Sequence, residues 1–230
     1  MTNEIGTLYI VATPIGHMED ITLRALRILK EVDMILCEDT RTTGKLLARY
    51  EIKNKTSSYH AHSTKDKENM IITMLQGGKN IALVSDAGTP CISDPGILLV
   101  KEVYSQFGKE AKVVPIPGAS ALISALSASG VSVADFIFLG FLPHKKGRET
   151  LFKEIATQTR PVVFYESSHR IIKTLESLDK FCTDKNVVIA RELTKIYEEF
   201  LKGKPGELLD VLNHDTNKQK GEFVVIVESL

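Results

Sequence analysis

The stretch SDAGTPCISDPG, residues 85–96, places acids, glycines and prolines directly after an apolar run. Carboxylates such as Asp86 can bind a cationic or hydroxyl-bearing ligand, and glycines such as Gly88 let a ligand approach the backbone closely. The pair Asp94-Pro95 is also typical of a helix start, with aspartate as the N-cap and proline at the first helical position. The stretch therefore has two interpretations, a ligand-binding loop or an ordinary turn followed by a capped helix.

Two further loops of this kind follow apolar runs in the first half of the chain, ATPIGHMED at 12–20 and PIPGASA at 115–121. In open parallel sheets, ligands bind at the carboxyl ends of the strands. A helix beginning near Ala119 would direct free N–H groups toward an acceptor such as a carboxylate. Each loop alone is more typical of a turn, but three of them at one sheet edge favour a ligand site.

The elements that would position these loops alternate between short β-branched runs and amphipathic segments. This pattern predicts an α/β fold with a mainly parallel sheet covered on both faces in the first half. The last three runs of the second half lie close together in sequence, which predicts antiparallel pairing and a mixed sheet. The predicted strands are 8–12, 34–37, 57–60, 80–85 and 112–116, then 136–139, 162–165, 187–191, 198–202 and 223–227.

Two domains are expected, because prolines and a glycine cluster near residue 117. We predict an N-terminal α/β domain over 1–117 with a mainly parallel sheet. We predict a C-terminal α/β domain over 118–230 with a mixed sheet. A helix rich in small residues is expected over 119–129, ended by Gly130.

Composition excludes several classes of protein. The 230 residues carry 29 basic and 29 acidic side chains, so the chain is not a uniformly basic nucleic-acid-binding domain. Three widely spaced cysteines argue against a disulfide framework or a zinc ribbon, and no His, Cys and Asp cluster has metal-binding spacing. No apolar run reaches membrane-span length, and the first residues lack the features of a signal peptide. We therefore expect a cytoplasmic protein without a metal or a membrane partner.

The common nucleotide-binding fingerprints are also missing from the sequence. There is no G-x-x-x-x-G-K-[ST] loop, and no G-x-G-x-x-G follows the first predicted strand. The chain therefore has neither a P-loop nor the usual dinucleotide-binding loop.

Seven motifs nevertheless occur in order along nearly the whole chain: TLYIVATPIG, EDTRTTGKLL, SDAGTPCISDPG, PIPGASALISALSASG, FLGFLP, FYESSHRI and IARELTKIYEEFLKG. Together they resemble the tetrapyrrole-methylase-like superfamily of S-adenosylmethionine (SAM) methyltransferases, a class III methyltransferase fold. Within it they are similar to the branch that methylates the ribose 2′-hydroxyl of a cytidine in the decoding region of 16S rRNA. One departure is His17-Met18, where that branch usually has Asn-Leu.

The resemblance implies two α/β domains with SAM in the cleft between them, a homodimer, and 16S rRNA of the small ribosomal subunit as partner. In it, Asp86 and backbone carbonyls would face the positive groups of SAM, and N–H groups near Ser120 would face its carboxylate. An alternative keeps the fold and SAM but makes the acceptor a tetrapyrrole or a modified protein residue. The implied cofactor-binding residues are Pro14, Ser85, Asp86, Ala87, Gly88, Ile92, Ser120, Ala121, Glu166, Ala190, Arg191 and Gly221.

Methyl transfer to a ribose hydroxyl needs an acceptor aligned with the donor and a group that takes the hydroxyl proton. The sequence does not rank the candidates for this general base. They are Asp20, Glu38, Asp39, His60, Glu166 and Glu192. Arg41, Arg170 and Arg191 are candidates for holding phosphates, and local salt bridges are the alternative for every one of these charged residues.

Binding to RNA needs local positive charge, which two segments supply. Residues 40–67 contain seven basic and two acidic side chains, and residues 143–153 contain four basic and one acidic side chain. Tyr50 and Tyr59 offer stacking faces in the first segment. A role in solubility alone is the alternative for any single lysine. The predicted RNA-binding residues are Arg41, Lys45, Arg49, Lys53, Lys55, Lys145, Lys146 and Arg148.

Overall fold

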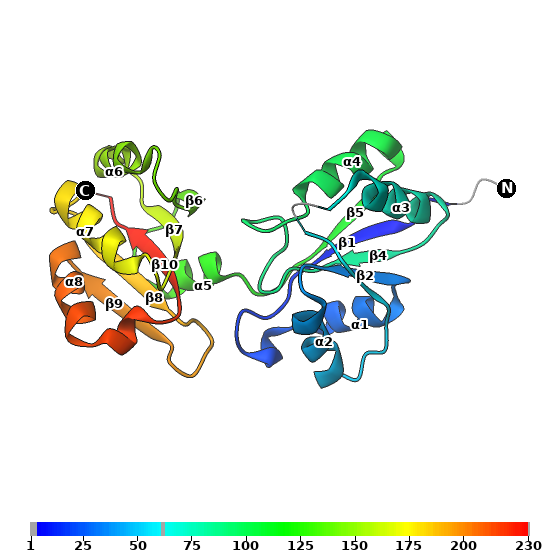
Figure 1. Cartoon of the computed structure of the whole chain (residues 1–230), viewed down its shortest axis with the longest axis horizontal. Coiled ribbons are helices and arrows are strands. Elements are labelled where there is room, and N and C mark those ends of the chain that lie inside the picture. The colour runs from blue at the N-terminus through cyan, green and yellow to red at the C-terminus, as the bar shows by residue number, and fades with distance from the viewer. Residues whose placement is uncertain (1–3, 61–62, 230) are drawn as a thin grey trace. The chain divides into compact units, whose positions relative to one another are not determined.

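The structure is a computed structural model that describes residues 4–60 and 63–229 (Figure 1). The chain divides into two compact units, Met1–Ser120 and Ala121–Leu230. The boundary expected near residue 117 lies just before this division. Each unit has its own sheet and its own helices, and each is described by itself.

The sheet of the first unit has five strands in the order β3-β2-β4-β1-β5, and every pairing is parallel. This confirms the prediction of a mainly parallel sheet. The central strands are buried on both faces, as their apolar sequences require. The strands are β1 (Thr7–Val11), β2 (Met34–Cys37), β3 (Thr56–Ser58), β4 (Ile81–Leu83) and β5 (Lys112–Ile116).

Helices cover both faces of this sheet, as Figure 1 shows. On one face, α1 (Leu23–Glu31) and α2 (Thr40–Arg49) pack on side chains of β1, β2 and β4. On the other face, α3 (Lys65–Gln76) and α4 (Ile97–Phe107) pack on the alternate side chains of the same strands. Since side chains alternate along a strand, two apolar faces need two layers of helices. Short 3₁₀ helices span Met18–Asp20 and Gly108–Glu110.

The start of α4 differs from the sequence-based expectation. Asp94-Pro95 predicts a capped helix start, but α4 begins at Ile97 and its N-cap is Gly96, with φ of 126° and no side-chain capping bond. A Cβ on Gly96 would lie 2.5 Å from Leu83 Cδ2, so only glycine fits both this space and this backbone conformation. Asp94 and Pro95 therefore belong to the loop and not to the helix.

The sheet of the second unit has the order β6-β7-β10-β8-β9. Strands β6 and β7 pair in parallel, and all other pairings are antiparallel, which confirms the predicted mixed sheet. The register between β6 and β7 shifts between Phe138 and Phe141. The strands are β6 (Ile137–Phe141), β7 (Val162–Ser167), β8 (Val187–Arg191), β9 (Glu199–Gly203) and β10 (Glu222–Val227).

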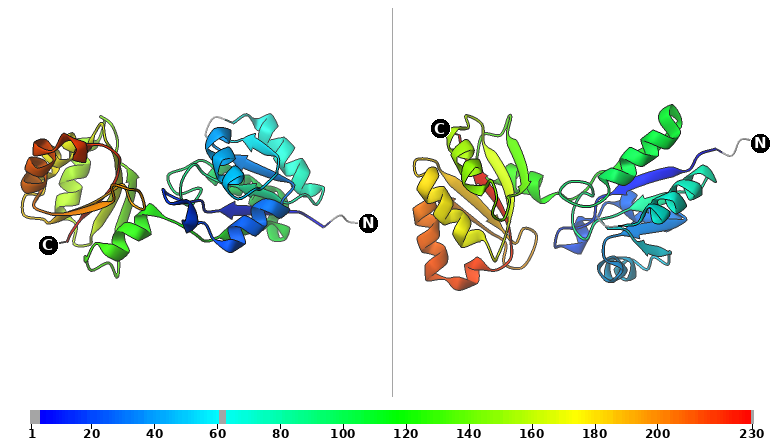
Figure 2. Two further views of the ribbon diagram at one scale, coloured as in Figure 1. Left: turned by 90° about the horizontal axis from the view of Figure 1, so that it is seen from below. Right: turned by 45° about the horizontal axis from the view of Figure 1, so that its top comes forward.

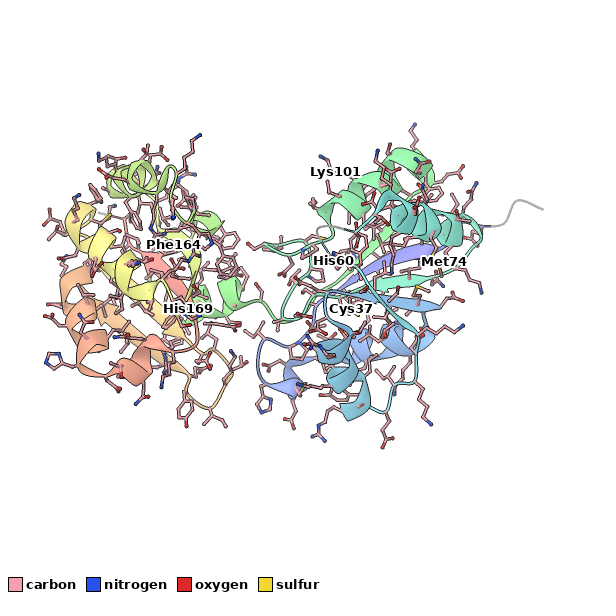
Figure 3. All side chains as sticks on the ribbon, viewed as in Figure 1. Cys37, His60, Met74, Lys101, Phe164 and His169 are labelled. Atoms are coloured by element: carbon pink, nitrogen blue, oxygen red, sulfur yellow. The ribbon has the colours of Figure 1, made fainter. Side chains whose placement is uncertain are left out.

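Three helices cover one face of the second sheet, and Figure 2 shows this layering from two further directions. They are α6 (Arg148–Thr157), α7 (Ile171–Phe181) and α8 (Pro205–His214), and the core between them and the sheet includes the fully buried Phe164 (Figure 3). Helix α5 (Ala121–Ala128) contacts β10, and a 3₁₀ helix spans Thr216–Gln219. Within the described residues, no helix has the length and apolarity needed to cross a membrane.

Gly96 provides a test of this packing. We expect Gly96→Ala to lower the free energy of unfolding by about 2–4 kcal/mol, because the new Cβ combines backbone strain with overlap on Leu83. The matched control is Gly44→Ala in α2, where a Cβ meets nothing within 4 Å. Removing a helix-interior glycine there should raise stability by about 0.5–1 kcal/mol. Urea denaturation checks both values, and equal stability of the two variants would contradict this account of Gly96.

Candidate functional site

Backbone pairing joins the loops that follow β1 and β4. The Thr13 N–H donates to the Gly88 carbonyl at 2.9 Å, and the Gly88 N–H donates to the Thr13 carbonyl at 3.1 Å. The Thr13 hydroxyl also donates to the Ser85 carbonyl at 3.1 Å, and the Ser85 hydroxyl lies 3.3 Å from the carbonyls of Ala87 and Gly88. These buried bonds make the two loops one unit of structure at the carboxyl edge of the sheet.

The loops after β2 and β5 join the same cluster. An oxygen of Asp86 accepts the N–H of Asp39 at 3.1 Å, and the Thr89 hydroxyl donates to the Ala119 carbonyl at 3.3 Å. The loop after β3 also lies at this edge, where Figure 3 labels Cys37 and His60. The structure therefore brings the predicted loops 12–20, 85–96 and 115–121 together.

Two glycines of these loops are required by contacts between the loops. Gly88 has φ of 81°, and a Cβ there would lie 3.3 Å from Ile15 Cγ2. A Cβ on Gly118 would lie 2.9 Å from the Cβ of Ala12. The sequence predicted that a ligand approaches the backbone closely at these glycines. On the side where a Cβ would lie, residues of the protein itself, Ile15 and Ala12, make that close approach.

Residues 91–96 hold a strained conformation. Cys91 and Ser93 have positive φ angles of 70° and 66°, which side-chain-bearing residues rarely adopt. Between them, the apolar side chain of Ile92 is 45% exposed. Strain of this kind is concentrated at ligand-binding sites and persists only when the surrounding structure holds it. This strained conformation distinguishes the loop 85–96 from an ordinary turn.

Within the described residues, three carboxylates at this edge, Glu38, Asp86 and Asp94, form no ion pair with a basic side chain. Burial raises the pKa of Asp94 to about 6, and the charges of Glu38 and Asp86 add to the rise. Burial also raises the pKa of Glu38, with the charge of Asp86 adding to it. The edge is therefore a region of negative potential that a cationic ligand would stabilise.

Asp39 behaves in the opposite way to its neighbour Glu38. Its side chain caps α2 and hydrogen-bonds Arg41, with the closest guanidinium nitrogen at 2.6 Å. These bonds lower the pKa of Asp39 to about 2. Adjacent acids whose environments move their pKa values apart are suited to different roles. The Asp39 side chain is therefore engaged in capping α2, whereas Glu38 forms no ion pair within the described residues.

Glu166, predicted as a cofactor ligand or a base, is committed to neighbours in the second unit. Its side chain is fully buried, with one oxygen 2.7 Å from Arg170 Nε and 2.9 Å from the Ser167 N–H. The other oxygen accepts the Thr174 hydroxyl at 2.6 Å and lies 3.8 Å from Arg148 Nη2. Both oxygens of this carboxylate are therefore occupied by partners within the second unit. Arg148 and Arg170 are both turned toward this carboxylate, and Arg148, predicted to bind RNA, is half-buried with internal hydrogen bonds to Thr174 and Pro143.

The predicted residues near the end of β8 also have internal partners. The Arg191 guanidinium donates to the carbonyls of Lys220, Tyr197 and Asn217 at 2.7, 3.2 and 2.9 Å, which leaves it unsuited to holding a phosphate. Glu192 binds Lys195 at 2.9 Å, which helps to lower the pKa of its carboxyl against the opposing effect of burial.

Gly221 precedes β10 with φ of 110°, and a Cβ there would lie 2.5 Å from Glu192 Cγ. Glu192 links the end of β8 to the start of β10, because its N–H donates to the Glu222 carbonyl and its side chain accepts the Glu222 N–H, both at 3.0 Å. Ala190 is fully buried in the middle of the sheet, between β10 and β9.

The remaining predicted residues vary in exposure. Asp20 is exposed in the first 3₁₀ helix, and His60 is exposed after β3. Pro14 and Ser85 are buried, Ser120 and Ala121 are half-buried, and Asp86 and Ala87 are exposed. The exposed predicted RNA-binding residues are Arg41, Lys45, Arg49, Lys53, Lys55, Lys145 and Lys146.

Sequence reasoning missed Asp94 as a site residue. The Asp-Pro pair matched the pattern of a helix start, so Asp94 was interpreted as an N-cap and not as an acid of the site. The available signal was its spacing from Asp86 within one loop. No group of three or more His, Cys, Asp or Glu in the described part of the chain is placed to hold a metal ion.

The architecture and the site together define a class: two-unit α/β proteins with a ligand-binding edge built from strand-end loops. Solved methyltransferase structures share this fold. Cobalt precorrin-4 methyltransferase matches with a TM-score of 0.67 at 15% identity, covering 96% of this chain and 94% of that one. Uroporphyrin-III-C-methyltransferase from Thermus thermophilus matches with a TM-score of 0.64 at 18% identity, covering 97% and 94%. At these identities the likeness concerns the fold alone.

Sequence comparison identifies the family. The profile described as Tetrapyrrole (Corrin/Porphyrin) Methylases matches residues 7–209. Proteins named Ribosomal RNA small subunit methyltransferase I match nearly the whole chain. The Vibrio cholerae protein is 51% identical over 98% of this chain and 78% of its own length, and the Thermotoga maritima protein is 45% identical over 97% and 98%. This chain belongs to the tetrapyrrole methylase family and, within it, to the group of ribosomal RNA small subunit methyltransferase I proteins.

The raised pKa of Asp94 predicts a pH-dependent stability difference. A native pKa of about 6 against the ordinary aspartate pKa of 3.8 in the unfolded chain means that the folded state retains a proton that the unfolded state releases. Wild-type stability should therefore fall as pH rises from about 4 to 6, and Asp94→Asn should remove this loss. Allowing for partial exposure, the variant should gain about 1 kcal/mol relative to wild type between pH 4 and pH 7.

Urea denaturation at pH 4 and pH 7 measures the effect of Asp94→Asn. Asp39→Asn is the control of opposite sign, because the pKa of Asp39 is lowered to about 2 by Arg41 and its charged form supports the native state. That variant should be less stable than wild type at pH 7. A pH-independent difference for Asp94→Asn would show that this carboxyl titrates normally in the native protein.

Proposed function

We propose that this protein transfers a methyl group from SAM to the ribose 2′-hydroxyl of a cytidine in the decoding region of 16S rRNA. The observation that carries the proposal is the match to ribosomal RNA small subunit methyltransferase I proteins over nearly the whole chain, at 47% identity for the Pasteurella multocida protein and 51% for the Vibrio cholerae protein. The motifs that suggested this acceptor extend through both units. We further propose that the enzyme is a cytoplasmic homodimer that acts on the small ribosomal subunit.

The acid edge of the first unit suits SAM. SAM supplies an electrophilic methyl group on a positively charged sulfonium. Glu38, Asp86 and Asp94 present negative potential that favours a cation over a neutral ligand, and the raised pKa values of Glu38 and Asp94 report the same potential. The proposed ligand contacts from this unit are Pro14, Ser85, Asp86, Ala87, Gly88, Ile92 and Ser120.

Contacts from the second unit are proposed through backbone groups. Ala121, Ala190, Arg191 and Gly221 remain proposed contacts. The side chains of Glu166 and Arg191 are held by internal partners, which favours main-chain contact at Arg191 and removes Glu166 from the proposed set. Backbone donors and acceptors are suited to an adenine or an amino-acid group because they hold a fixed geometry.

Among the candidate bases, Glu38 fits the role best. A general base needs a pKa near the working pH, and burial raises the pKa of Glu38 while Arg41 lowers that of Asp39. Glu166 and Glu192 are engaged in ion pairs. Glu38 lies at the carboxyl end of β2, beside the Asp39 N–H that donates to Asp86. We therefore propose that Glu38 takes the ribose hydroxyl proton.

The direct test is methylation of small ribosomal subunits that lack this modification, using labelled SAM. Mass spectrometry of the digested rRNA should show 2′-O-methylcytidine. Glu38→Gln should lower kcat by about 10²–10⁴-fold, because it removes proton transfer, and should leave SAM affinity within a few-fold. Asp39→Asn is the matched control and should have a much smaller effect on kcat.

The family description also favours a second acceptor, a tetrapyrrole, since the profile and the fold neighbours are tetrapyrrole methylases. The assay therefore includes a parallel reaction with a precorrin-type substrate. Label in the tetrapyrrole and none in rRNA would overturn the proposed function. SAM binding with no turnover on either substrate would overturn it in favour of a SAM-binding module.

The carboxylates make SAM affinity depend on pH. A sulfonium favours ionised Asp94, whose pKa is raised to about 6, so SAM affinity should increase about tenfold from pH 5 to pH 7. S-adenosylhomocysteine lacks the sulfonium charge and should show a smaller increase. Asp94→Asn should reduce the difference between the two ligands. Isothermal titration calorimetry measures all four cases, and identical pH profiles for the two ligands would contradict a sulfonium near this edge.

A further inference from the structure

A basic loop, residues 143–147, follows β6 in the second unit, and two arginines hydrogen-bond to the backbone carbonyls at its start. Arg170 Nη1 donates to the Leu142 carbonyl at 2.8 Å, and Arg148 Nη1 donates to the Pro143 carbonyl at 3.2 Å. Both arginine side chains are only 15% exposed. The loop therefore begins from two fixed carbonyls, although residues 143–147 are themselves exposed.

Glu166 fixes the two arginines. It is the only carboxylate paired with either of them in the described residues, and the Thr174 hydroxyl completes the network by accepting from Arg148 Nη2 and donating to Glu166, each at 2.6 Å. Burying such a network contributes little net stability, because desolvation offsets the attraction. What it does provide is a defined geometry for the groups that it holds, here the start of the basic loop.

An aromatic surface lies at the end of β6 where this loop begins. Phe141 is 55% exposed, and its ring centroid is 5.5 Å from that of Tyr165, which lies 5.1 Å from the ring of Phe138. Phe141 and Tyr165 are register partners on β6 and β7. Since side chains alternate along β7, Tyr165 lies on the opposite face of the sheet from Glu166. The aromatic group therefore lies outside the core formed with α6, α7 and α8.

The charges beside Phe141 indicate what covers it. The loop carries Lys145 and Lys146, both exposed, and no acid lies between residues 141 and 147. An exposed aromatic ring followed by cations complements a single-stranded nucleic acid, whose bases stack on rings and whose phosphates bind lysines. An acidic protein surface would use the lysines but gain little from the exposed ring of Phe141.

We propose that residues 141–147 form an RNA-binding site in which the exposed ring of Phe141 stacks on one base and the tilted ring of Tyr165 packs against Phe141 and holds it in place. Lys145 and Lys146 bind the flanking phosphates, and Glu166 is a positioning residue that acts through Arg148 and Arg170. This inference rests on the proposed function, because it assumes that the acceptor is RNA. It adds a specific base-stacking site and a role for the buried carboxylate.

The contributions of base stacking and of charge to RNA affinity are separated by measuring the affinity at several salt concentrations. The probe is a fluorescently labelled fragment of 16S rRNA that spans the decoding region, and the protein is the full chain. Phe141→Leu should weaken binding by about 5- to 100-fold without changing the salt dependence, because it removes a ring and no charge. Lys145→Ala with Lys146→Ala should reduce the slope of log affinity against log salt by about 1.4.

The matched control for Phe141→Leu is Tyr104→Leu. Tyr104 lies on α4 of the first unit and is 52% exposed, close to the 55% of Phe141. The Tyr104→Leu variant should bind the RNA fragment with the same affinity as the wild-type protein. Calorimetry with SAM should give unchanged affinity for both variants. An unchanged RNA affinity for Phe141→Leu, in a wild-type protein that methylates rRNA, would overturn this inference while leaving the proposed function intact.

The positioning role of Glu166 is tested by a double-mutant cycle. If Glu166→Gln weakens RNA binding by displacing the basic loop, the loss should largely disappear in the background that lacks Lys145 and Lys146. A general structural defect would instead weaken both backgrounds equally and overturn the role. Arg170→Lys, which keeps the charge but shortens the reach to Leu142, replaces Glu166→Gln if that variant does not fold.

Discussion

The reciprocal backbone bonds between Thr13 and Gly88 are the constraint on which the candidate site depends. Parallel strands end at the same edge of a sheet, but nothing in that arrangement orders the loops beyond their last paired residues. The two bonds add a short antiparallel bridge between the loops after β1 and β4. Once residue 88 is held there, Asp86 meets the N–H of Asp39 and Thr89 meets the carbonyl of Ala119. Four strand ends thereby share one framework, and the positive φ of Gly88 is its conformational requirement.

Much of the fold could be predicted from the sequence because each sheet follows simple periodicities. The predicted strands 34–37, 112–116 and 187–191 coincide with β2, β5 and β8, where short runs of mainly apolar residues lie between helices or loops. Prediction was weaker where strands are short. Of the predicted strand 80–85, only Ile81–Leu83 forms a strand in the structure. Val84 and Ser85 already belong to the loop after β4 that is hydrogen-bonded to the loop after β1. Local sequence pattern does not include the long-range bonds that end a strand early.

The site was less predictable than the fold, for a physical reason visible at Asp94 and Arg148. An Asp-Pro pair is typical of a helix start. In the structure, however, α4 begins only after Gly96, where Leu83 occupies the space that a Cβ of residue 96 would need. Arg148 belongs to a basic segment, yet Glu166 and Thr174 draw it inward. In both cases a residue distant in sequence decides the role. Composition identifies charged residues, but only the folded chain shows which of them have found a partner.

The two units place charge in opposite ways, and this contrast connects site and chemistry. In the second unit, Glu166 is surrounded by Arg148, Arg170 and Thr174, so its charge is satisfied internally and serves geometry. At the edge of the first unit, burial and neighbouring acids raise the pKa values of Glu38 and Asp94, and the charge of His60 and a hydrogen bond from Ser85 offset this only in part. Folding alone gives no reason to maintain such a group, since converting either acid to an amide would relieve the repulsion. We propose that the positively charged methyl donor binds there and supplies this compensation, so that the raised pKa values at this edge and its proposed affinity for the donor have the same electrostatic origin.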